Sequence, residues 1–140
     1  MNAQDYLKQY KRILDKIKKK KELAKEYERL ASSTPPIVFD RVGTNPNRNT
    51  EAPFVKWVYK KIEVEEELKI LEEKASHVRN ETLDTICELE NETYQRILIN
   101  RYIDNDGWET IANKNYIAIS TVYRFHRQAI LMVEKILIKS

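Results

Sequence analysis

Six side chains that suit contact with nucleic acid lie close together near the C-terminal end of the chain. They are Ser120, Thr121, Tyr123, Arg124, Arg127 and Gln128. An arginine can donate two hydrogen bonds to one guanine, and Ser, Thr and Gln side chains can bind base edges or phosphates. If Val122 faces inward, these side chains lie on or near the outer face of one helix. The pattern therefore predicts a helix that contacts double-stranded DNA in the major groove.

A second set of basic side chains are candidate phosphate contacts. They are Lys18, Lys19, Lys20, Lys21, Lys114 and His126. A phosphate contact contributes affinity but carries no sequence information. For the four consecutive lysines, a solvated helix face is the alternative interpretation. For His126 the alternative is a role in helix packing.

No pattern of residues points to catalysis, a metal or a cofactor. Two histidines and one cysteine supply no zinc-binding set. Residues 104–107 faintly resemble a calcium loop, but Asn113 stands where that loop requires a bidentate Glu. There is no Gly-rich phosphate loop and no nucleophile–base pair. We therefore expect a protein that is not an enzyme, and we expect Cys87 to be a buried, apolar-like side chain.

Charge is distributed unevenly along the chain. The net charge is +3, but residues 1–31 carry +5, residues 62–92 carry −8 and residues 111–140 carry +4. A polyanion such as DNA would meet the two ends and be repelled by the middle. No apolar run approaches the roughly 18 residues of a membrane span, and the N-terminus lacks a signal core. With a single cysteine, these features indicate a cytoplasmic protein that contacts no membrane.

An all-α fold is expected to position these residues. Only 2 glycines and 4 prolines occur in 140 residues, and 34% of the residues are charged. Residues 1–31 are predicted to form a basic N-terminal helix, and residues 32–53, which hold all four prolines, a linker. Residues 54–90 are predicted to form a long acidic helix, and residues 91–140 a separate DNA-binding domain.

The long acidic helix carries an apolar seam on alternating four- and three-residue steps. Its positions are Val64, Leu68, Leu71, Ala75, Val78, Thr82 and Leu89. This seam suits an antiparallel hairpin with the 1–31 helix, and it equally suits pairing between subunits. Because the seam is long and a single recognition helix gives limited specificity, we expect a homo-oligomer, most simply a dimer held by this helix.

The DNA-binding domain is predicted to contain three helices, at about 92–103, 107–114 and 119–138. Asp106 followed by Glu109 is a capping-box pattern that would start the second of them. A small core of Ile111, Ala112, Ile117 and Val122 would join the last two helices, in the order of a helix-turn-helix. The turn between them lacks the usual glycine, so either Asn115 or Tyr116 must adopt a left-handed backbone.

A resemblance to known families rests on these same residues. The pattern R-Y-x-x-x-x-x-W-E-x-I-A … T-V-Y-R-x-H-R-x-A, which begins at Arg101, resembles region 4 of bacterial sigma factors. Together with the opening MNAQDYLKQYKRILDKI and the phrase NPNRN at 45–49, it makes the whole chain resemble the ArpU/RinA-like family of phage and prophage late-transcription regulators. This resemblance implies DNA binding upstream of late phage operons in the host cytoplasm, without catalysis.

Two alternative functions fit the same features. A small terminase subunit also joins a helix-turn-helix to helical oligomerisation segments, although it usually places the DNA-binding motif first. An interaction module that mimics a sigma factor would bind RNA polymerase without touching DNA. Salt-dependent binding to duplex DNA distinguishes the second alternative from the other two functions.

Overall fold

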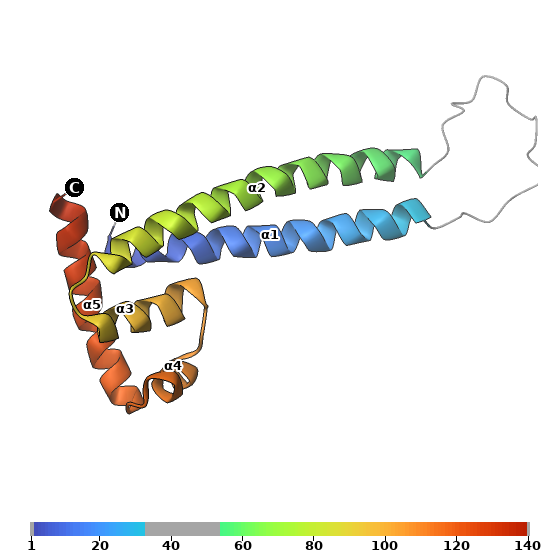
Figure 1. The fold of residues 1–140 in the computed structure, drawn as a ribbon. Coiled ribbons are helices and arrows are strands. Elements are labelled where there is room, and N and C mark those ends of the chain that lie inside the picture. The colour runs from blue at the N-terminus through green and yellow to red at the C-terminus, as the bar shows by residue number, and fades with distance from the viewer. Residues whose placement is uncertain (1, 33–53, 140) are drawn as a thin grey trace, which may run out of the picture. The chain divides into compact units, whose positions relative to one another are not determined.

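All regular structure in the computed structural model, which describes residues 2–32 and 54–139, is helical (Figure 1). The helices are α1 (Ala3–Ser32), α2 (Val55–Cys87), α3 (Glu92–Leu98), the π-helical turn η2 (Ile99–Ile103), α4 (Trp108–Asn115) and α5 (Ile119–Lys139). The all-α fold predicted from the sequence is confirmed. Of the predicted linker, residues 33–53 lie outside the described residues.

The chain divides into two compact units, and the division cuts through α1 and α2. One unit contains Met1–Lys16 and Glu72–Ser140, and the other contains Ile17–Leu71. In the Ile17–Leu71 unit, parts of α1 and α2 lie side by side. Lys20 Nζ is 2.7 Å from Glu67 Oε2, and the rings of Tyr27 and Trp57 stack at 5.8 Å. Residues later in α1 therefore meet residues earlier in α2, which makes this pairing antiparallel.

Most of the apolar seam along residues 64–89 is buried within a single chain, and Leu71 and Val78 are half-buried. Val64 and Leu68 are buried in the Ile17–Leu71 unit, while Ala75, Thr82 and Leu89 are buried in the other. Thr82 satisfies its hydroxyl by donating to the backbone carbonyl of Val78 at 2.8 Å. Of the two interpretations of the seam, the intramolecular hairpin is the one that the structure adopts.

The unit that contains the C-terminal half of the chain is built around a core shared by five elements. Its buried members are Ala3, Leu7, Ile86, Leu89, Leu98, Tyr102, Ala129 and Val133. They come from α1, the end of α2, α3, η2 and α5, so the first residues of the chain pack beside the last helix. At the edge of this core the hydroxyls of Tyr6 and Thr85 share a hydrogen bond of 2.9 Å. Cys87, which was expected to be buried, is instead exposed at the end of α2.

The predicted 92–103 helix exists, but it changes pitch at its centre. Asn91 caps the start of α3 by accepting a hydrogen bond from the backbone N–H of Tyr94 at 3.1 Å. At its end the backbone N–H of Asp104 donates to the carbonyl of Ile99, five residues earlier, at 3.0 Å. This wider turn contains two consecutive buried residues, Tyr102 and Ile103. It therefore places the Tyr102 hydroxyl in the interior.

Candidate nucleic-acid interface

α4 starts one residue later than the capping-box pattern predicted. Its N-cap is Gly107, in an extended conformation and without a side chain to accept a hydrogen bond. The Asp106 carboxylate, one position too early to cap, accepts instead from Lys114 Nζ at 2.6 Å. The capping-box prediction is therefore wrong. The carboxylate ties the start of α4 to its last turn.

The turn between α4 and α5 uses a left-handed tyrosine. Tyr116 has φ 56° and ψ 39°, and the next backbone N–H, of Ile117, donates to the carbonyl of Ala112 at 3.1 Å. Asn115, the other candidate, stays helical. Its side-chain amide donates to the carbonyl of Ile111 at 2.8 Å and to the side-chain oxygen of Asn100 at 3.1 Å. The Tyr116 side chain is 94% exposed, so no buried contact offsets its backbone strain.

We expect Tyr116→Gly to raise the free energy of unfolding by up to about 1 kcal/mol. A glycine relieves a left-handed conformation that costs about 1–2 kcal/mol, and it returns part of that gain through its greater freedom in the unfolded chain. Urea unfolding followed by circular dichroism measures the change. Tyr116→Ala is the control, because it removes the same aromatic ring but keeps a Cβ. Equal free energies of unfolding for the two variants would contradict the claim that the left-handed backbone at residue 116 is strained.

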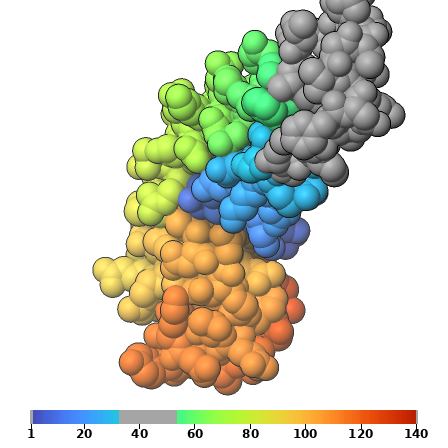
Figure 2. Space-filling model, turned by 90° about the vertical axis from the view of Figure 1, so that its right-hand side faces the viewer, coloured from blue at the N-terminus to red at the C-terminus, as the bar shows by residue number. Residues whose placement is uncertain are grey.

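A small apolar core joins α3, α4 and α5. It contains Ile97, Ile111, Ala112 and Val122, with Trp108, Ile117 and Phe125 packed against it. This confirms the predicted core of Ile111, Ala112, Ile117 and Val122. In Figure 2 the orange segments, from α3 to the start of α5, form one continuous packed surface. The orientation of α5 is therefore fixed by buried contacts on one face.

α5 has one buried face and one exposed face. Val122, His126, Ala129 and Val133 are buried. Of the six predicted DNA contacts, Ser120, Tyr123, Arg124, Arg127 and Gln128 are exposed, and Thr121 is half-buried. The structure thus gathers all six on the first half of the helix, at or beside its outer face.

Three of these side chains also contact neighbouring residues. The Tyr123 ring lies edge-on to Trp108 with ring centroids 5.2 Å apart. The Arg124 guanidinium lies 5.2 Å from the centre of the Phe125 ring. Gln128 accepts a hydrogen bond from the Tyr94 hydroxyl. These contacts restrict the three side chains before any partner binds. The side chains therefore lose less conformational entropy on binding.

The candidate phosphate contacts fall into different environments. Lys18, Lys19 and Lys21 are exposed. Lys20 is paired with Glu67, and Lys114 with Asp106, each through a short hydrogen bond that raises the pKa of the lysine. A phosphate would have to displace a carboxylate from either of these two lysines. Lys18 and Lys19 therefore remain the more accessible candidates.

His126 is not accessible to a phosphate. It is only 7% exposed, and its Nε2 lies 2.6 Å from the Tyr102 hydroxyl. Its ring meets the Trp108 ring edge-on at 4.9 Å. Burial, followed by the nearby charges of Arg101 and Lys8, lowers the pKa of His126 to about 4. The phosphate-contact prediction for His126 is wrong, and the alternative of helix packing is correct. Its spacing from Val122 and Ala129 on one helix face was the signal for this.

Arg101 is a residue whose role the sequence reasoning missed. Its guanidinium carbon lies 4.1 Å from the centre of the Trp108 ring, and its Nη1 donates to the carbonyl of Asp106 at 3.1 Å. It therefore holds the turn that leads into α4. The seven-residue spacing between Arg101 and Trp108 was visible in the sequence, but nothing in it indicated a stacking contact.

Comparison with known proteins gives no relatives: no family model matches the chain, and neither a curated protein nor a solved structure is significantly similar to it. Within residues 2–32 and 54–139, no three His, Cys, Asp or Glu side chains gather as a metal site would require. None of the described helices combines the length and the apolar character needed to cross a bilayer.

Proposed function

We propose that this protein is a sequence-specific, DNA-binding transcription regulator in which α4 and α5 act as a helix-turn-helix. The observation that carries the proposal is the division of α5 into two faces. Val122, His126, Ala129 and Val133 anchor the helix in the interior, while Arg124 and Arg127 remain exposed between these anchors. A helix held in this way is able to enter the major groove, about 12 Å wide, without losing its own packing.

The geometry suggests a role for each part of the helix. Ser120 and Thr121 lie in the first turn of α5, where the helix dipole favours a phosphate. The backbone N–H of Thr121 already donates to the carbonyl of Ala118 at 3.0 Å, so the two hydroxyls are the groups that suit this contact. Arg124 and Arg127 follow one turn later and suit bidentate donation to guanine. Residues 111–140 carry +4, which would favour approach to DNA in general.

We further propose that the regulator belongs to the phage type and activates late genes. The support is the resemblance of the opening segment, the 45–49 phrase and the C-terminal motif to the ArpU/RinA-like and sigma region 4 patterns. Oligomerisation remains part of the proposal, since two half-sites about one helical turn apart would supply the specificity that one α5 lacks.

The experiment that tests the function is selection of bound fragments from the phage or prophage genome, followed by binding titrations of the full chain. We expect one site near a late promoter, bound far more tightly than random duplex, with an affinity that falls steeply with salt. A site at the packaging origin would favour the small terminase subunit. Failure to bind any duplex, together with capture of RNA polymerase, would favour the sigma-mimic alternative.

Arg124→Ala is expected to weaken specific binding by about 1–3 kcal/mol, the usual contribution of a bidentate base contact. Fluorescence anisotropy with the selected duplex and a random duplex measures it. Arg79→Ala, which removes an exposed arginine from the acidic segment of α2, is the matched control and should leave affinity unchanged. Equal losses on both duplexes would reassign Arg124 to a phosphate, and an unchanged affinity would remove it from the interface.

A further inference from the structure

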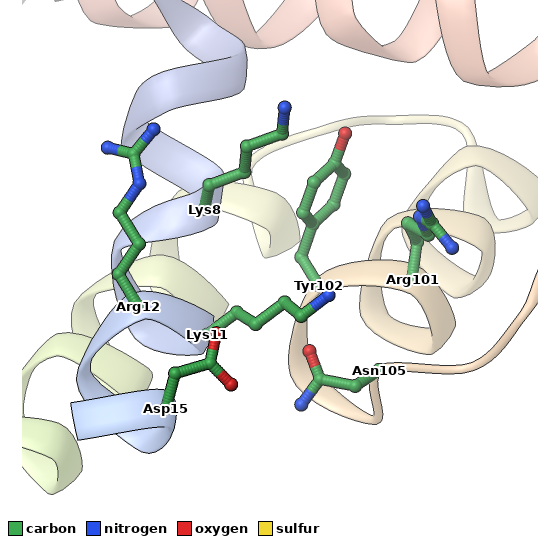
Figure 3. A pocket seen from close by; sticks show the side chains of 7 residues that line it. All are labelled: Lys8, Lys11, Arg12, Asp15, Arg101, Tyr102 and Asn105. Carbon is green, nitrogen blue, oxygen red and sulfur yellow. The ribbon is translucent and has the colours of Figure 1, made fainter. Parts of the chain in front are cut away.

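A basic pocket lies between the start of α1 and the η2 turn, inside one compact unit (Figure 3). It has a volume of about 280 Å³ and is lined by Lys8, Lys11, Arg12, Asp15, Arg101, Tyr102 and Asn105. Figure 3 shows the Lys8 and Lys11 side chains extending from α1 toward Tyr102. Residues that are about ninety positions apart in the sequence thus form one concave surface.

The lining is strongly positive, with four cationic side chains against one carboxylate. Arg12 has a partner outside the lining, Asp5, at 3.3 Å. Lys8 and Lys11 make no ion pair within the described residues, although both belong to a helix with nearby carboxylates. The guanidinium of Arg101 donates to the Asp106 carbonyl and stacks on Trp108, and these contacts hold it in place. Neither of these two contacts involves a carboxylate that would neutralise its charge.

The positive charge of the pocket also affects a buried side chain behind it, His126. Tyr102 forms the inner wall, and its hydroxyl is hydrogen-bonded to His126 Nε2 at 2.6 Å. Arg101 and Lys8, both in the lining, are the charges that help to lower the pKa of His126. A bound group that neutralised these two charges would therefore change the electrostatics around His126, on the buried face of α5. The opposite face of this helix carries Arg124 and Arg127.

We propose that this pocket binds a phosphate-type anion at a site separate from the outer face of α5. The volume is just below the roughly 300–1,000 Å³ of pockets for drug-sized molecules, so the occupant is a small anionic group. Lys8 and Lys11 supply ammonium donors from α1, while Arg101 in the η2 turn and Asn105 just after it supply further donors. The group comes either from a small phosphorylated molecule or from a DNA backbone. The site itself does not depend on the proposed regulator function.

The test uses the full chain and the double variant Lys8→Gln/Lys11→Gln. Inorganic phosphate is titrated at constant ionic strength against chloride, and the backbone N–H signals of Arg101 and Asn105 are followed by NMR. We expect saturable shifts in the wild-type protein and an affinity about tenfold lower in the variant, since two cations are lost from the site. Lys16→Gln/Lys25→Gln removes the same charge from exposed positions of α1 outside the lining, and should bind phosphate as the wild type does.

A second arm distinguishes the two sources of the anion. If a DNA phosphate occupies the pocket, the selected duplex shifts the same Arg101 and Asn105 signals, and the Lys8→Gln/Lys11→Gln variant has a salt dependence of log K shallower by about 2. If a small molecule occupies it, free phosphate saturates the site and the salt dependence is unchanged. Absence of both responses, or equal phosphate binding by the wild type and the Lys8→Gln/Lys11→Gln variant, would overturn the proposal whether or not the protein binds DNA.

Discussion

Leu98→Ala is expected to lower the free energy of unfolding by about 2–5 kcal/mol, the usual range for a leucine truncated in a close-packed core. Leu98 is fully buried at the end of α3, in the cluster that includes Leu7, Ile86 and Val133. This cluster joins segments from both ends of the sequence. The neighbouring helices are held by other buried residues and are able to close only part of the cavity. Urea unfolding of the full chain, followed by circular dichroism, gives the change from the transition midpoint.

Leu131→Ala provides the matched control for this prediction. It makes the same chemical change on α5, at a side chain that is 59% exposed. We expect a change within about 0.5 kcal/mol, as for most surface substitutions. Similar losses in the two variants would mean that Leu98 does not lie in the core that is described above.

The stability of the protein is expected to fall by about 3 kcal/mol as the pH drops from 6.5 to 4, because of His126 alone. Its pKa is lowered from 6.5 to about 4 in the folded chain. Between these values the unfolded chain binds a proton that the folded chain does not, so the folded state loses stability as the pH falls. Above pH 6.5 the imidazole is neutral in both states, and its contribution is constant.

The measurement is the free energy of unfolding against pH for the wild type and for His126→Gln. Carboxylates titrate in both proteins, so the difference between the two curves isolates the imidazole. We expect His126→Gln to be the less stable protein near pH 7, because Tyr102 loses its present hydrogen-bond partner, and the gap to narrow toward pH 4. His77→Gln, which removes an exposed imidazole, is the matched control. A gap that stays constant from pH 7 to pH 4 would show that His126 titrates normally in the folded state.

The helices and the inner face of α5 were predictable because they depend on local periodicity. Val122, Ala129 and Val133 recur at helical spacing, and all three are buried. The predicted boundaries of α1 and α5 agree with the structure to within two residues, whereas α2 ends at Cys87, three residues before the predicted end at residue 90. The small core of Ile111, Ala112 and Val122 followed from the same spacing, because residues three or four apart share a helix face.

The sequence alone did not determine which partner each polar group would choose. Asp106 was expected to cap α4, but it stands one position before the N-cap and accepts from Lys114, which lies within reach only once α4 has formed. His126 was a candidate phosphate contact, with helix packing as the alternative, and only the placement of Tyr102 and Trp108 around it decided for packing. In both cases the deciding contact joins residues that come close to each other only when the chain is folded.

The sequence by itself therefore determined the helical class, the spacing of the candidate DNA contacts and the apolar seam of α2. Only the tertiary structure decided that α1 covers this seam, and that Lys8 and Lys11 meet Arg101 to form a pocket. Periodicity reports which side of a helix is apolar, but many partners satisfy the same apolar side equally well. The choice among them comes from the packing of the whole core, in which Ala3 and Leu7 meet Ala129 and Val133 across more than a hundred residues of sequence.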